Sequence, residues 1–148
     1  MTPVFQKVID KEHGDCMQAT VASLFDLSIE NVPEFIKLGG EWFDSMSSIY
    51  KDKGYSLCCF NPRKNIERTK EVLKADKGVG GYWAASVASV HFGDGVTHSV
   101  IIDENMNVVH DPNPNNKNHI YFSEDILSID VCGTSDWYID IDGKLIIN

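Results

Sequence analysis

Apolar residues near the start of the chain recur at the spacing of an α-helix. The apolar positions are Met17, Val21, Leu24 and Phe25. They stand at i, i+4, i+7 and i+8, so a helix gathers them on one face. Asp15, just before them, is a residue type that caps helices by accepting exposed backbone N–H groups. The pattern predicts a helix that Asp15 caps and that ends near residue 27.

A second helix is predicted over residues 41–53. Its apolar positions are Trp42, Met46, Ile49 and Tyr50. They again recur at helical spacing, and Gly54 is the expected stop because glycine readily adopts the conformation that ends helices. Between the two helices, residues 28–35 have the pattern of a short capped turn that Pro33 closes.

After Gly54 the pattern changes mainly to that of β-strands. Strands are predicted over 55–60, 80–90, 98–103, 107–111, 137–141 and 144–148, and a polar helix over 65–76. A tight turn at 104–106 and the "DG" pair at 142–143 each predict an antiparallel hairpin. Helices followed mainly by antiparallel strands make an α+β fold. The length predicts a single domain over residues 1–148.

Composition and charge narrow the classes of function. Hydrophobic residues make up 43% of the chain, charged residues 24%, and the net charge is −9. An acidic surface without a basic patch repels phosphate backbones, so nucleic-acid binding is not expected. No stretch approaches the roughly 20 apolar residues of a membrane helix, and the start lacks the apolar run of a signal peptide. We therefore expect a cytoplasmic protein without membrane contact, and the pattern predicts no particular oligomeric state.

The four cysteines are candidates for chemistry. They are Cys16, Cys58, Cys59 and Cys132. In the cytoplasm they are expected to be reduced thiols. No CxxC or HExxH spacing occurs, so we predict no metal site and no cofactor.

Cys16 stands in the first turn of the predicted helix. The partial positive charge at a helix N-terminus stabilises a thiolate, and the exposed N–H groups can hold a developing oxyanion. The alternative is packing, because free cysteine is among the most buried residue types. A nucleophilic role requires a base, so the histidines decide between the two interpretations.

The chain has five histidines, of which His98 has the most informative position. They are His13, His91, His98, His110 and His119. A two-residue turn at 104–105 would place His98 directly opposite Asp111 on the neighbouring strand. Directly opposed side chains share a face with Cβ atoms about 5 Å apart, and His110 then points to the other face. The pair is either an oriented base or an ordinary cross-strand contact at the surface.

Taken together, Cys16, His98 and Asp111 have the chain order of a nucleophile, a base and an orienting acid. The segments that carry them are "GDCMQATVASLFDL" (14–27), "THSVIID" (97–103) and "VVHDPNP" (108–114). These segments resemble the papain-like cysteine hydrolase superfamily, above all its small members: bacteriocin-processing peptidases, cell-wall amidases, transglutaminase-like proteins and short phage-encoded relatives. The resemblance implies a papain-like domain whose N-terminal helix carries the cysteine and packs on an antiparallel sheet. It also implies a catalytic triad of these three residues.

The resemblance further implies a glutamine, about six residues before the cysteine, whose amide stabilises the oxyanion. Asp10 stands at that spacing, and its charge would repel an oxyanion. Gln6 lies ten residues before Cys16. It can take this role only if the loop "KVIDKEHGD" folds back over the start of the helix.

Two hypotheses follow. In the first, the protein is a thiol hydrolase, a peptidase or an amidase, that forms a thioester on Cys16. Its substrate is a peptide, a protein or an amide-containing small molecule, and deamidation or acyl transfer uses the same intermediate. In the second, the scaffold is catalytically degenerate and binds a host protein or a small-molecule signal. The unusual residue at the oxyanion position favours the second hypothesis.

Overall fold

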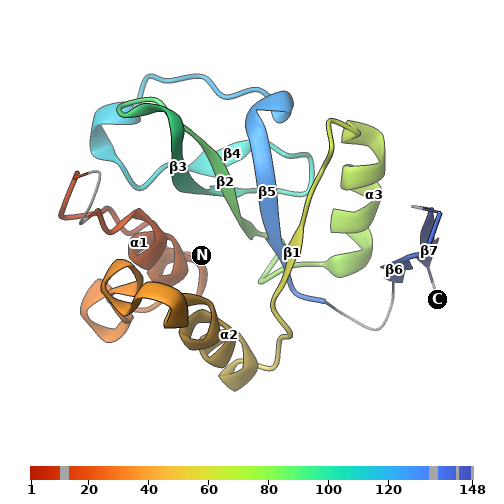
Figure 1. Ribbon diagram of the computed structural model, residues 1–148, viewed down its shortest axis with the longest axis horizontal. Helices are drawn as coiled ribbons and strands as arrows, with labels where there is room; N and C mark the ends of the chain where they lie inside the picture. Colours follow the sequence, from red (N-terminus) through yellow and green to blue (C-terminus); the bar gives the residue numbers. More distant parts are fainter. Residues whose placement is uncertain (11–13, 134–136, 143, 148) are drawn as a thin grey trace.

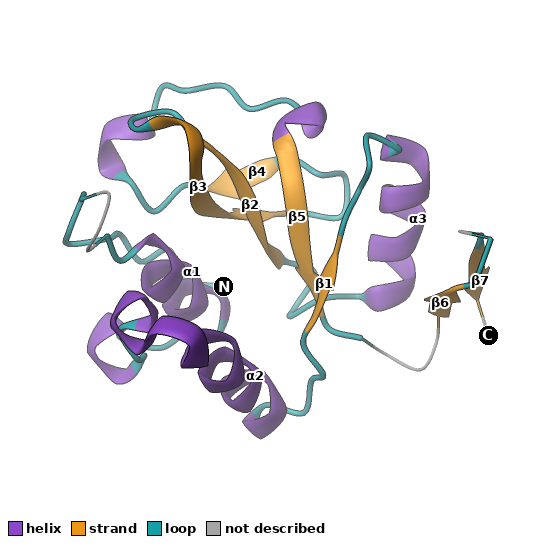
Figure 2. Cartoon of the chain, viewed as in Figure 1, coloured by secondary structure: helices purple, strands orange, loops and turns teal. Residues whose placement is uncertain are grey.

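The computed structural model describes residues 1–10, 14–133, 137–142 and 144–147. The helices are α1 (Cys16–Leu24), α2 (Trp42–Asp52) and α3 (Ile66–Asp76), with short 3-10 turns η1 (Ile29–Asn31), η2 (Phe35–Glu41), η3 (Pro114–Asn116) and η4 (Ser123–Asp125). The strands are β1 (Cys58–Phe60), β2 (Trp83–Ser89), β3 (Gly93–Ile102), β4 (Val108–His110), β5 (Ile126–Val131), β6 (Trp137–Ile139) and β7 (Leu145–Ile147). Helices α1 and α2 precede the strands, and α3 stands between β1 and β2. The fold combines helices with an antiparallel sheet and is of the predicted α+β class (Figure 2). None of the described helices is long and apolar enough to cross a membrane.

Five of the strands form one antiparallel sheet in the order β1-β5-β2-β3-β4. The longest pairing joins β2 and β3, which follow each other in the chain. Strands β6 and β7 form a separate antiparallel hairpin, as the "DG" turn predicts. In Figure 1 this hairpin lies beyond α3, away from α1 and α2.

The helices cover the two faces of the sheet (Figure 1). Helices α1 and α2 share a core with Ala84 of β2 and Ile101 of β3. Helix α3 contributes to a second core that contains Val100 and Ile102. Neighbouring residues of a strand point to opposite faces, so the alternation along β3 divides the interior into these two cores. The predicted packing of the cysteine-bearing helix on an antiparallel sheet is present.

Helix α1 ends at Leu24, earlier than the predicted residue 27. The Leu27 N–H donates to the Ala22 carbonyl at 2.8 Å, and the Asp26 N–H donates to that of Ser23 at 3.4 Å. Asp26 itself has a φ of 56°, in the left-handed region. This is a Schellman motif, in which a left-handed residue closes the helix. The apolar stripe of the sequence continues beyond this stop, which is why periodicity alone extends the helix too far.

Strand β3 begins at Gly93, five residues before the predicted start at His98. Residues 93–95 are glycine, aspartate and glycine, residue types that are depleted in strands. The backbone of residues 93–97 is held by pairing with β2, through Ala88 to Thr97 and Ser89 to Gly93. Strand β3 therefore includes five residues that precede its predicted start.

Candidate active site

Cys16 is the first residue of α1 and is half-buried at a cleft. Asp15 stands at the N-cap position, but its side chain does not cap the helix, so that prediction was wrong. Its carboxylate instead accepts hydrogen bonds from the backbone N–H groups of Lys7 (3.0 Å) and Val8 (3.1 Å). Both carboxylate oxygens are thus used to hold the N-terminal segment across the start of α1.

His98 and Asp111 form a buried pair. The Nε2 atom of His98 lies 2.6 Å from Oδ1 of Asp111, and the two side chains are only 9% and 10% exposed. A short contact between a histidine and a carboxylate at this depth fixes the orientation of the ring and the position of its protons. The contact predicted from the hairpin is therefore present.

The strand register behind that prediction was wrong. Ile101 pairs with His110 and Ile102 with Val108, and the register shifts between the two pairs. The Asp103 N–H donates to the Asn107 carbonyl at 3.0 Å, so the turn consists of residues 104–106, one more than the two assumed. Met106, the last of them, has a φ of 63°. Asp111 follows the end of β4 and reaches His98 from the next segment of the chain.

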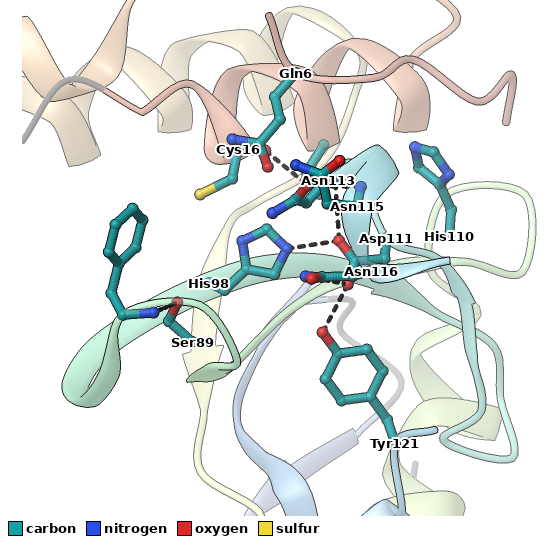
Figure 3. Close-up of polar contacts among 12 residues, drawn as sticks. Gln6, Cys16, Ser89, His98, His110, Asp111, Asn113, Asn115, Asn116 and Tyr121 are labelled. Carbon is teal, nitrogen blue, oxygen red and sulfur yellow. Dashed lines mark hydrogen bonds and ion pairs between the residues drawn. The ribbon is translucent and has the colours of Figure 1, made fainter. Parts of the chain in front are cut away.

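Three further donors hold the Asp111 carboxylate (Figure 3). The backbone N–H of Asn113 donates to Oδ1 at 2.9 Å, while Asn116 Nδ2 and the Tyr121 hydroxyl donate to Oδ2 at 3.2 and 2.6 Å. Sequence reasoning missed Asn116 and Tyr121. The Asn113 contact is an Asx turn, which "DPN" favours, but no local pattern relates Tyr121 to Asp111 across ten residues.

These contacts set the protonation states of the pair. Burial by itself lowers the pKa of His98, but hydrogen bonds and charge from Asp111 and Cys16 outweigh it and raise this pKa to about 9. Burial by itself raises the pKa of Asp111, but the hydrogen bonds from His98 and Tyr121 hold it below its usual value. At neutral pH the pair is therefore an imidazolium and a carboxylate.

Cys16 lies on the opposite side of the His98 ring from Asp111. Figure 3 shows the Cys16 sulfur on the side that the second ring nitrogen, Nδ1, faces. Interaction with the Cys16 thiol is one of the causes that raise the pKa of His98. A protonated His98 can therefore donate to Asp111 through Nε2 and to a thiolate through Nδ1.

Gln6 lies beside Cys16, at the top of the same cleft (Figure 3). The backbone N–H of Gln6 donates to the Pro112 carbonyl at 2.9 Å, so the N-terminal segment folds back as the oxyanion hypothesis requires. Its Nε2 donates to the Val8 carbonyl at 2.9 Å, while Oε1 is buried without a hydrogen-bond partner. An amide nitrogen has two protons, so Nε2 can donate a second hydrogen bond. Asp10 also lines this cleft.

The other described histidines have different surroundings. The Nε2 atom of His110 lies 2.8 Å from the Val4 carbonyl and points away from His98 (Figure 3). His91 lines the cleft and is exposed, and His119 packs against the ring of Tyr121. His13 lies outside the described residues. Within the described part of the chain, no group of three His, Cys, Asp or Glu side chains is placed to hold a metal ion.

The cleft that contains Cys16 and His98 has a volume of about 620 Å³. Its walls come from the N-terminal segment, the start of α1, η2 with the start of α2, and the β2–β3 turn. A cavity of this size accepts a drug-sized molecule or a few residues of a peptide.

Comparison with protein-family models, with curated proteins and with solved structures found no match to this chain.

The raised pKa of His98 predicts that stability falls with rising pH. A folded-state pKa of about 9 against 6.5 in the unfolded chain means that the folded protein holds this proton more tightly. The stabilisation is complete below pH 6.5 and is lost as the pH rises through 9, a change of about 3 kcal/mol in the free energy of unfolding. Urea unfolding at a series of pH values measures this decline.

The control for this measurement is His98→Gln, which removes the titrating ring. Burial raises the pKa of the Cys132 thiol to about 12, so that thiol adds a decline of the same sign at alkaline pH. The difference between the two proteins isolates the contribution of His98. Parallel pH profiles for the wild type and the variant would contradict the prediction.

Proposed function

We propose that the protein is a cysteine-dependent acyl-transfer enzyme with a papain-like fold, acting as a peptidase or amidase in the cytoplasm. The observation that carries the proposal is the arrangement around one ring. His98 is fixed by buried Asp111 at 2.6 Å through Nε2 and presents Nδ1 toward Cys16 at the start of a helix. A nucleophile, a base and an orienting acid at one cleft match the requirements of covalent acyl transfer.

In the proposed reaction, the Cys16 thiolate adds to the carbonyl carbon of an amide. His98 gives its Nδ1 proton to the departing amine as the C–N bond breaks, and a thioester forms on Cys16. His98 then accepts a proton from water, which attacks the thioester and releases the acid. Asp111 stays ionised and holds the ring throughout. The second N–H of the Gln6 amide and the backbone N–H groups at the helix start are donors that can serve the oxyanion.

The second candidate is a binding protein on the same scaffold. Two observations favour it: Asp10 lines the cleft, and Gln6 Nε2 is partly used by the Val8 carbonyl. Both weaken the stabilisation of a negative oxygen. In this case a host protein or a small molecule would occupy the cleft without being converted.

Acylation by p-nitrophenyl acetate tests the proposal. We expect a burst of p-nitrophenol, an acetyl group on Cys16 in a mass-mapped digest, and continued turnover. Cys16→Ser should abolish the burst. The matched control Cys58→Ser, which removes an exposed thiol, should retain it. Acetylation that Cys16→Ser leaves unchanged contradicts the enzyme, while a burst without turnover favours the binding protein.

A further inference from the structure

The cleft beside Cys16 has an apolar wall built from two parts of the chain. Phe35, Ile36 and Trp42 come from η2 and the start of α2, and Phe92 and Val96 come from the β2–β3 hairpin. The first part is distant in sequence from both Cys16 and His98, whereas Phe92 and Val96 closely precede His98, and all of them line the same cavity. The reacting groups therefore lie next to a surface suited to an apolar ligand.

Three of these side chains remain open to solvent. Ile36 is 46% exposed, Trp42 39% and Phe92 37%, whereas Phe35 beneath them is buried. Large apolar side chains that are gathered and exposed around a concavity mark a ligand site, because filling it removes their surface from water.

The charged groups of the cleft exclude one kind of ligand. Among the described residues, three carboxylates line it, those of Asp10, Asp15 and Glu34. Of the basic residues there, Lys37 is paired with Glu34 and His98 with Asp111. A substrate carboxylate in this cavity would meet an excess of negative charge in a partly desolvated space. A neutral or cationic compound meets no such barrier.

We propose that the substrate is a peptide with a large apolar side chain within the two residues before the reacting carbonyl, and with no carboxylate there. This inference rests on the proposed function and specifies its substrate class. The apolar side chain lies against Trp42 and Phe92 while the carbonyl carbon meets the Cys16 sulfur. The bond that breaks is an internal amide, since a free terminal carboxylate would enter the acidic cleft.

A matched set of covalent probes tests the inference. Acetyl-dipeptide acyloxymethyl ketones carry phenylalanine, glycine or aspartate in either position before the ketone. They alkylate the cysteine with loss of the acyloxy group. We expect the phenylalanine probe to modify Cys16 at least about tenfold faster than the glycine probe, and the aspartate probe to be the slowest.

Variants of the wall locate the selectivity. Trp42→Ala and Phe92→Ala should reduce the ratio of phenylalanine to glycine rates toward one, because they remove apolar surface and leave the reacting groups in place. Tyr138→Ala is the matched control, since Tyr138 is an exposed aromatic residue on β6 that does not line the cleft. It should leave the ratio unchanged.

The outcomes separate this inference from the proposed function. p-Nitrophenyl acetate carries only a methyl group, so its reaction with Cys16 does not need the apolar wall. If Cys16 is acetylated but all three probes react equally, or the aspartate probe reacts fastest, the substrate class is wrong and the proposed function stands. The same holds if no probe reacts. If Cys16 is not acetylated and its alkylation is independent of His98, both are overturned.

Discussion

Replacing His98 by alanine is expected to slow the alkylation of Cys16 by iodoacetamide at pH 6 by about 100-fold, as for the loss of a catalytic acid–base group. At pH 6 an ordinary thiol is almost entirely protonated and unreactive. His98, with a pKa of about 9, is protonated at this pH and can hold a thiolate beside it. The loss of the ring removes this positive charge, so Cys16 should then react like an ordinary thiol.

The measurement is the rate of modification of each cysteine, read from mass-mapped digests at timed intervals. Exposed Cys58 and Cys59 serve as internal references in the same sample. The matched control is His119→Ala, which removes an exposed histidine and should leave the Cys16 rate within about threefold of wild type.

Asp111→Asn and Tyr121→Phe should give intermediate rates. The first removes the carboxylate charge that supports the protonated ring, and the second removes one of the donors that hold this carboxylate. A Cys16 rate that is unchanged in His98→Ala would contradict the nucleophile–base pair. So would a Cys16 that reacts only after unfolding in urea.

The helices and the hairpin contacts were the most predictable parts of the fold. Residues 41–53 and 65–76 were predicted as helices, and α2 and α3 match them closely because their polar and apolar positions repeat at helical spacing. The contact between His98 and Asp111 could be predicted from the sequence because a single turn joins the segments that carry them. Its register could not be predicted, since the left-handed Met106 and the bulge that follows leave no clear sequence signal.

Contacts between distant segments were not predictable. The hydrogen bond from Tyr121 to Asp111 depends on how the elements pack rather than on local sequence pattern. The same is true of the apolar wall that η2 and the β2–β3 turn form. Asp76 is the clearest case. At the end of a polar helix it resembles a surface residue, yet it is only 1% exposed because α3 inserts its last turn between the sheet and the C-terminal hairpin.

The buried Asp76 carboxylate joins three parts of the fold. Its acceptor bonds go to the indole N–H of Trp83 (2.8 Å) and the backbone N–H groups of Cys132 (2.9 Å) and Gly133 (3.0 Å). The fourth donor is the indole N–H of Trp137, at 3.1 Å, which connects β6 to the rest of the molecule. Four donors around one carboxylate satisfy a group that would otherwise be too costly to bury.

Asp76→Ala is therefore expected to lower the free energy of unfolding by at least about 3 kcal/mol, because it leaves several buried N–H groups without an acceptor. Asp76→Asn should lose less, since its amide oxygen still accepts while its NH₂ group faces two donors. Urea unfolding monitored by tryptophan fluorescence measures both. The matched control is Asp140→Ala, because Asp140 also accepts backbone N–H groups, from Asp142 and Lys144, but in an exposed turn. This control should cost less than about 1 kcal/mol.

Equal losses in Asp76→Ala and Asp140→Ala would show that the buried carboxylate does not hold the hairpin to the sheet. Loss of the Trp137 contact alone, in Trp137→Phe, should destabilise less than Asp76→Ala because the other three donors keep their acceptor.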